Sequence, residues 1–190
     1  GATAPVLRFW RRGDYWPVRL GITREATSGS YSVLVLKPLS PTGSELFRRL
    51  RPRFRTQLRL LLPDLWRDLD PALVAALAAD PQGSRDDFPA AYLEVAAGFA
   101  RGERPYESVI HALEPLVWQA AGRVPCPLTE APWAVAVAKV LQRHPPQEVA
   151  ARTHLRGRAA VFETLRWAIQ HLLAHRSPQP PPSTRCRPWP

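Results

Sequence analysis

Cysteine and lysine are scarce in this sequence, and the scarcity of cysteine bears on where the protein works. There are two cysteines, Cys126 and Cys186, and only two lysines, Lys37 and Lys139. Two cysteines far apart in the chain do not make a disulfide framework, so both are expected to be free thiols. We therefore expect a reducing, intracellular compartment, either cytoplasm or nucleus.

Long apolar runs are also missing. No run approaches the roughly 18 apolar residues that a membrane-spanning helix needs. The start of the sequence, 1–5, lacks the basic and apolar regions of a secretory signal. The sequence therefore predicts no membrane partner and no secretory signal.

Patterns that would indicate catalysis are few. There is no glycine-rich phosphate loop, no GxSxG, no HExxH and no strong zinc spacing. His171 and His175 could share a metal, but a third ligand is missing, and a helix C-terminus alone favours histidines. Aspartates that could hold a metal for a nuclease lie where helix capping explains them: Asp64, Asp68, Asp70, Asp80, Asp86 and Asp87. We expect no cofactor, no metal and no enzyme, with a nuclease as the lesser alternative.

What the sequence does contain is positive charge carried by arginine. Lysine and arginine together number 26 against 16 acidic residues, which gives a net charge of +10 and a pI near 10.9. The planar guanidinium group makes bidentate contacts with phosphate and carboxylate. The balance favours a polyanionic or acidic partner, namely nucleic acid (DNA or RNA) or an acidic protein.

The N-terminal 43 residues have the pattern of short strands. Three runs, 6–10, 15–22 and 31–36, are rich in β-branched and aromatic residues, with turn sequences at 11–14 and 27–30. We predict a three-stranded β-meander over 1–43. Three short strands would be marginal alone, so one face is expected to pack on the helices that follow.

Residues 44–176 have the pattern of a helical domain. Ser44 is the predicted N-cap of the first helix, Pro52 is expected to start the second, and Asp70-Pro71 is expected to open the third. Further helices are predicted at 89–101, 105–121, 132–143, 146–153 and 157–175. Residues 177–190 are rich in proline and are expected to be a disordered tail. The fold class is α+β, mainly α, with the meander packed on a helical bundle.

Two groups of arginines are candidates for binding phosphates. The first is a ridge of six within twelve residues: Arg48, Arg49, Arg51, Arg53, Arg55 and Arg59. The second belongs to the last two helices: Arg152, Arg156, Arg158 and Arg166. Clustered arginines neutralise phosphates, although such a run is also typical of a solvated helix face paired with nearby acids. The last two helices loosely resemble a helix-turn-helix, and an ordinary helical hairpin is the alternative.

Two tryptophans are candidates for binding a partner. Trp167 is predicted to lie opposite the apolar stripe of the last helix, and Trp189 lies in the proline-rich tail. Exposing the large apolar surface of a tryptophan to water is unfavourable, so we expect a partner protein or another helix of the same chain to pack on it. The sequence thus favours a non-catalytic nucleic-acid-binding protein or a subunit of a nucleoprotein complex. The alternative is an adaptor that binds an acidic or apolar protein partner.

Overall fold

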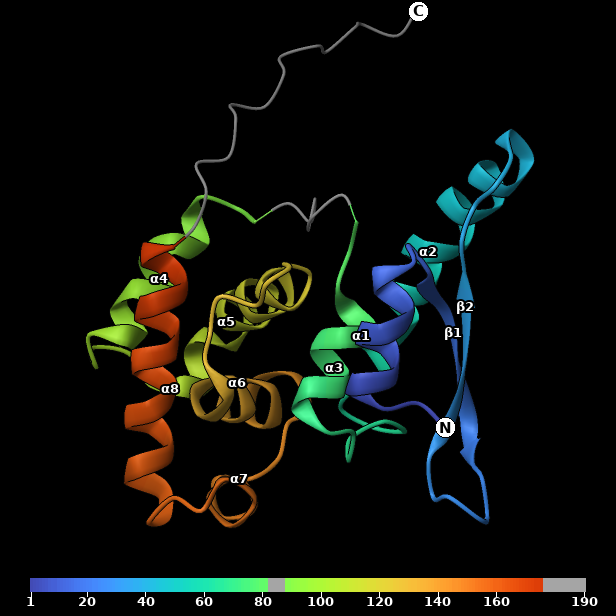
Figure 1. The fold of residues 1–190 in the computed structure, drawn as a ribbon. Coiled ribbons are helices and arrows are strands. Elements are labelled where there is room, and N and C mark those ends of the chain that lie inside the picture. The colour runs from blue at the N-terminus through green and yellow to red at the C-terminus, as the bar shows by residue number, and fades with distance from the viewer. Residues whose placement is uncertain (82–87, 176–190) are drawn as a thin grey trace, which may run out of the picture.

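The fold is that of a computed structural model, which describes residues 1–81 and 88–175 (Figure 1). The prediction of a mainly helical chain is confirmed. The elements are, in order, α1 (Ala4–Arg12), β1 (Trp16–Arg24), β2 (Tyr31–Leu36), α2 (Pro41–Leu61), α3 (Pro71–Ala78), α4 (Ala91–Ala100), α5 (Tyr106–Ala121), α6 (Glu130–Ala136), the π-helical turn η1 (Val137–Leu141), α7 (Pro146–Thr153) and α8 (Gly157–Ala174).

The N-terminal sheet has two strands within the described residues, so the prediction of a three-stranded meander is wrong. β1 and β2 pair antiparallel, with Trp16 opposite Leu36 at one end. Residues 6–10, the expected first strand, lie inside α1. Thr3 caps this helix by accepting a hydrogen bond from the Val6 amide at 3.4 Å. In a run of only five mostly apolar residues, periodicity does not distinguish a strand from a helix. Here the Thr3 cap favours the helix.

Helix α2 begins earlier and runs further than the sequence predicts. Its N-cap is Ser40, whose hydroxyl accepts from the Gly43 amide at 3.1 Å, and Pro41 occupies its first turn. The helix continues through Pro52, so neither the predicted cap at Ser44 nor the predicted start at Pro52 is correct. The equivalent prediction for α3 is confirmed, because Asp70 accepts from two amides of the first turn at 2.9 and 3.1 Å.

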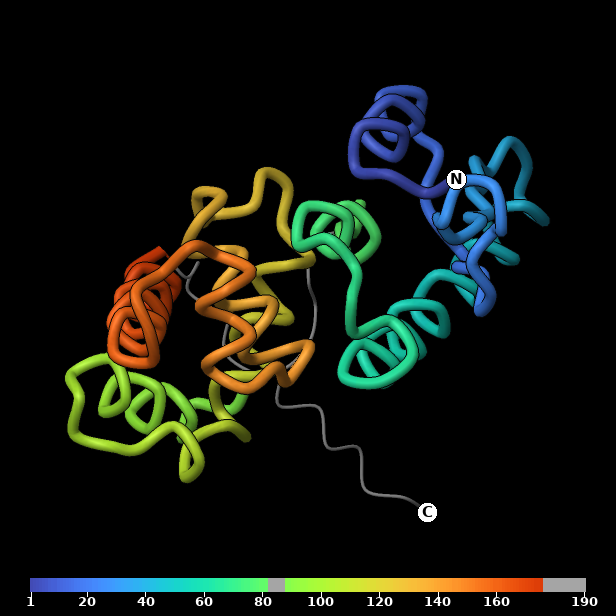
Figure 2. Tube along the Cα trace, turned by 90° about the horizontal axis from the view of Figure 1, so that it is seen from below, coloured from blue at the N-terminus to red at the C-terminus, as the bar shows by residue number. Residues whose placement is uncertain are grey.

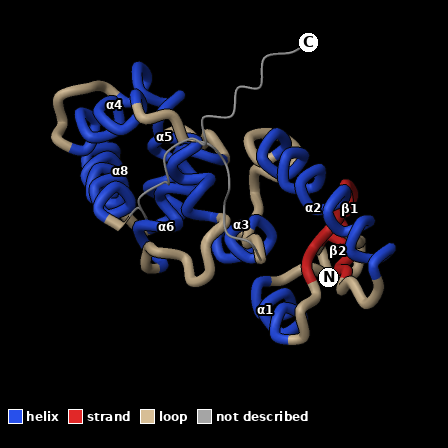
Figure 3. The backbone as a smooth tube through the Cα atoms, turned by 90° about the horizontal axis from the view of Figure 1, so that it is seen from above, coloured by secondary structure: helices blue, strands red, loops and turns tan. Residues whose placement is uncertain are grey.

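The helices pack around α5 and α6. Helix α8 contacts α4, α5, α6 and α7, while α3 contacts α1, α2, α5 and α6. In Figures 1 and 3, α4 and α8 lie on one side of α5 and α6, and α2 and the two strands lie on the other. Buried side chains from Ala2 to Leu172 form one hydrophobic cluster. The division of the chain at residue 43 stays a prediction.

None of the helices in the described ranges is long and apolar enough to cross a membrane. Residues 177–190, with Cys186 and Trp189, and the aspartates at 86 and 87 lie outside the described residues. Cys126 is a free cysteine, and burial raises the pKa of its thiol.

Candidate functional site

Five of the six arginines of the predicted ridge divide between two faces of α2. Residues four apart share a helix face, and residues two apart lie on nearly opposite faces. Arg51, Arg55 and Arg59 are spaced by four, as are Arg49 and Arg53. The first set turns toward the protein interior together with Phe54 and Leu58, which are buried, and the second set turns to solvent.

Arg51 is buried, with 2% of its surface exposed, and its guanidinium group binds backbone carbonyls from two other elements. It donates to Pro17 O at 2.6 Å, to Leu77 O at 2.9 Å and to Ala79 O. The last two acceptors lie at the C-terminus of α3, where carbonyls lack helical partners and the helix dipole is negative. Arg51 therefore joins β1, α2 and α3.

Arg55 reinforces this contact. It donates to Ala78 O, and Asp80 lies 3.5 Å from Arg55 and 3.9 Å from Arg51. Burial, together with the repulsion of Arg55, lowers the pKa of Arg51 from its ordinary value to about 9, and Asp80 opposes that shift. Arg51 thus keeps its charge at neutral pH. These two arginines stabilise the fold by donating hydrogen bonds to the free carbonyls at the C-terminus of α3.

Arg59 binds α5. Its guanidinium group forms a two-point contact with the Glu114 carboxylate, with 2.7 Å between Arg59 Nε and Glu114 Oε1. Arg55 and Arg59 both lie over the Trp118 ring, at 5.3 and 6.0 Å from its centre. These side chains line a cleft of about 680 Å³ between α2 and α5, which Arg48 and Arg143 also border.

The outer face of α2 carries arginines that solvent reaches. Arg49 and Arg53 are exposed, and neither forms an ion pair with a described residue. Arg48, which borders the cleft rather than the outer face, pairs with Glu45 one turn earlier, and both side chains are exposed. Exposed pairs of this kind contribute little to stability, so Arg48 can exchange its partner for another anion at small cost.

The second group of arginines lies around α7 and α8. Arg152 forms an ion pair with Asp68, so it links α7 to the segment that follows α2. Arg156 and Arg158 are exposed at the start of α8, and Arg158 covers the Phe162 ring at 5.3 Å. Arg166 is half-buried over Phe99.

The segment between α7 and α8 has the connectivity that the sequence predicts. Residues 154–156 separate the two helices, and the helix bounds of 146–153 agree with the prediction. His154 adopts a left-handed conformation with φ of 56°, and Gly157 follows with φ of 81°. Arg156 and Arg158 follow this tight turn and are exposed.

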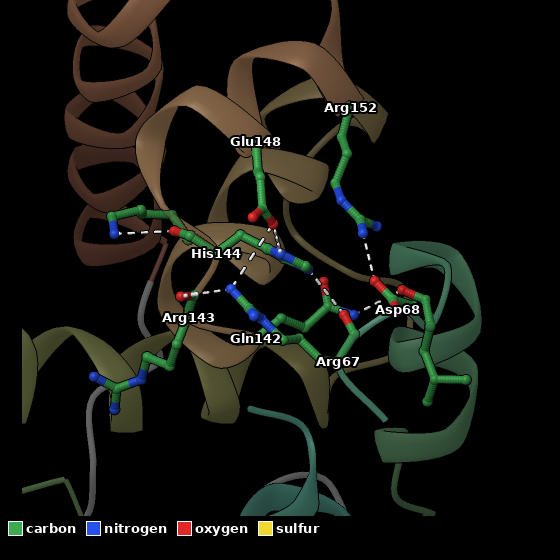
Figure 4. A network of polar contacts seen from close by, with 9 residues as sticks. Arg67, Asp68, Gln142, Arg143, His144, Glu148 and Arg152 are labelled. Atoms are coloured by element: carbon green, nitrogen blue, oxygen red, sulfur yellow. Dashed lines mark hydrogen bonds and ion pairs between the residues drawn. The ribbon is translucent and has the colours of Figure 1, made fainter. Parts of the chain in front are cut away.

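A polar network that the sequence did not reveal holds α7 in place (Figure 4). His144, 1% exposed, lies 2.7 Å from a Glu148 carboxylate oxygen through Nδ1 and 2.9 Å from Arg67 O through Nε2. Nε2–H donates to Arg67 O, which leaves Nδ1 facing the Glu148 carboxylate. Gln142 donates to Leu69 O at 2.7 Å in the same network. The network joins the 62–70 segment to α7.

We expect His144→Ala to lower the free energy of unfolding by about 1–3 kcal/mol, because the part-buried Arg67 O would lose its donor and the buried imidazole ring would be removed. The matched control is His154→Asn, since His154 is exposed and asparagine tolerates its left-handed backbone. Urea unfolding followed by circular dichroism measures both. Equal stability of the two variants would mean that the network does not stabilise the chain.

Trp167 lies where the sequence predicts, on the exposed face of α8, with 49% of its surface exposed. Within residues 1–81 and 88–175, no helix buries it as a core residue. Its ring stacks on His171, with 5.1 Å between ring centres and 14° between planes, and His171 stacks on His175 at 4.0 Å and 27°. His171 and His175 thus belong to an aromatic column. The described residues contain no group of three or more histidine, cysteine or acidic side chains that could hold a metal.

The two groups of exposed arginines lie far apart. Figures 1, 2 and 3 place α2 and α8 on opposite sides of the helices between them. They form two separate arginine-bearing surfaces, one on α2 and one at the start of α8. The fold and these surfaces define a basic, mainly helical segment suited to an extended polyanion.

The chain is similar to proteins named tRNA(Met) cytidine acetyltransferase TmcA. It is 42% identical over 179 residues to the one from Nitrosococcus halophilus, which covers 92% of this chain and 24% of that protein. It is 33% identical over 175 residues to the one from Haloferax volcanii, which covers 91% of this chain and 23% of the relative. It is 31% identical over 156 residues to the one from Pyrococcus abyssi, and this alignment covers 79% of this chain and 19% of that protein. No protein-family model matches the chain.

These similarities correct the function expected from the sequence. The relatives are named as enzymes, which contradicts a non-catalytic role, whether as a nucleic-acid-binding protein or as an adaptor. The chain spans about a quarter or less of the length of the curated relatives it matches. The similarity therefore concerns a segment of those enzymes.

Proposed function

We propose that this chain is part of a tRNA cytidine acetyltransferase and that its exposed arginines hold the RNA substrate. The observation that carries the proposal is the similarity to enzymes named for a tRNA substrate, which extends over 92% of the chain in one case. A net charge of +10 fits the same substrate, because tRNA is a polyanion.

The proposed contacts are arginines whose side chains are exposed and form no ion pair with a described residue. Arg49 and Arg53 on α2 and Arg156 and Arg158 at the start of α8 are exposed. Long side chains in this state can reach phosphates without breaking an ion pair, and Arg158 would give up only its contact with the Phe162 ring. Arg51 and Arg55 are left out of the proposed surface, because their guanidinium groups bind the end of α3.

The other arginines of the two groups are proposed as secondary contacts. Arg48, Arg59 and Arg152 each pair with an acidic side chain. To bind phosphate they would have to exchange that carboxylate for RNA, which costs least for the exposed Arg48 pair. Arg166 is half-buried, and the Nε of its guanidinium has no hydrogen-bond partner within the described part of the chain.

The separation of the two surfaces suits a large, folded RNA. Double-helical RNA is recognised mainly through its shape, its phosphates and its 2′-hydroxyl groups. A molecule of the size of tRNA can touch basic surfaces on both sides of α5 and α6, whereas a short single strand can reach only one. The proposal thus favours structured RNA over a generic polyanion.

We expect the chain to bind tRNA(Met) more tightly than a DNA duplex with the same number of phosphates. The measurement is competition for labelled tRNA(Met), read by fluorescence anisotropy at fixed salt, with unlabelled tRNA(Met) and the DNA duplex as competitors. Preference for tRNA would follow from contacts with A-form shape and 2′-hydroxyl groups. Equal competition by the two, or no binding at low salt, would contradict the proposed substrate.

A further inference from the structure

The aromatic column on α8, formed by Trp167, His171 and His175, is the feature that phosphate binding does not account for. The three residues are spaced by four and so lie on one face of the helix. The apolar residues Leu165, Ile169 and Leu172 are buried on the other side. The column is therefore not needed to fill the core, and half of the Trp167 surface stays in solvent.

Hydrogen bonds orient the two histidine rings of the column. His171 Nε2 donates to Pro127 O at 3.1 Å, and His175 Nδ1 donates to His171 O at 2.9 Å. At the C-terminal end, Arg123 donates to His175 O at 2.8 Å. The nearly parallel packing of Trp167 on His171 then fixes the plane of the indole ring. An aromatic face oriented in advance can bind a second flat ring at low entropic cost.

We infer that the Trp167 column is a stacking site for unpaired bases of the RNA, which rests on the proposed function. Bases stack on exposed aromatic rings whatever their sequence, and tryptophan offers the largest such surface. The surrounding charges favour a base over a phosphate at the ring itself. Glu163, one turn before Trp167, is exposed and repels phosphate, while Arg123 lies at the far end of the column.

The test is Trp167→Ala in the full chain, with a labelled single-stranded RNA oligonucleotide and an RNA duplex of equal phosphate number as probes. Loss of one to two stacked bases, at about 1–3 kcal/mol each, predicts a fall in single-strand affinity of at least about fivefold. Duplex affinity is expected to change less than twofold, because paired bases cannot reach the ring. Trp167→Phe keeps an aromatic face and is expected to retain most of the single-strand affinity.

A structural role for Trp167 would give a different result. Because the ring is half exposed, Trp167→Ala is expected to shift the melting temperature by no more than about 2–4 °C. An unchanged single-strand affinity would overturn the inference and leave the column to a protein partner. Equal losses for single strand and duplex would also overturn it. In either case, intact binding of tRNA(Met) by the wild-type chain would leave the proposed function standing.

Discussion

Replacing Arg51 by methionine is expected to lower the free energy of unfolding by about 3–5 kcal/mol, the range found when one member of a buried charged contact is removed. The substitution would leave Pro17 O, Leu77 O and Ala79 O without the donor they share, and Asp80 would lose one of its cations. Methionine has a similar length, so the loss reports on hydrogen bonding more than on volume. The measurement is urea unfolding at neutral pH, where Arg51 is charged.

Arg53→Met is the matched control for this experiment. Arg53 lies two residues along the same helix, carries the same charge and is exposed. Surface substitutions of this kind usually change stability by less than about 0.5 kcal/mol. If Arg51→Met and Arg53→Met had the same stability, the carbonyl contacts of Arg51 would not stabilise the fold.

The helices could be predicted from the sequence because their ends carry local signals. Proline in the first turn opens α3 and α7, and both starts were placed correctly. The same signal is present at Ser40-Pro41, whereas the cap is predicted at Ser44, so the predicted start of α2 lies too late in the chain. The prediction of a strand at residues 6–10 is wrong because a short apolar run is compatible with a strand and with a helix. Only the Thr3 cap distinguishes the two structures.

The candidate site was predicted only in part. A helix predicted to begin at Pro52 excludes Arg51, whereas a helix running through Pro52 puts Arg51 on the same face as Phe54 and Leu58. That spacing could have indicated an inward-facing arginine. Its acceptors at Leu77 and Ala79 are 26 and 28 residues away, and no local rule pairs them. The face of the helix on which each arginine lies could be predicted from the sequence, but the distant carbonyls that Arg51 binds could not.

The catalytic context was missed for a different reason. Net charge and clustered arginines indicate a polyanionic partner, and a binding protein and an enzyme that acts on a polyanion both need them. Composition therefore cannot separate the two classes. The similarity to proteins named as acetyltransferases argues against a non-catalytic binding protein, because it compares the order of residues along 92% of the chain.

Removing the exposed arginines is expected to weaken RNA binding far more than any single change. In the variant R49Q/R53Q/R156Q/R158Q, each lost phosphate contact should lower the slope of log K against log salt by about 0.7–0.9. Four lost contacts would then reduce affinity at 0.1 M salt by about two to four orders of magnitude. Stability should change little, because all four side chains are exposed.

The control removes the same charge from another surface. The variant R8Q/R12Q/R19Q/R24Q also replaces four exposed arginines, in α1 and β1. Both variants lower the net charge of the chain by four from +10. Any effect of overall charge on RNA binding is therefore shared, and the difference between the variants reports on contacts at α2 and α8.

The most direct measurement is the affinity for tRNA(Met) as a function of salt concentration for the wild-type chain and these two variants. The account predicts a steep slope for the wild type, a slope shallower by about three for R49Q/R53Q/R156Q/R158Q, and a slope close to wild type for the control. An unchanged slope in R49Q/R53Q/R156Q/R158Q, or an equal reduction in both variants, would contradict the claim that the exposed arginines of α2 and α8 hold the RNA.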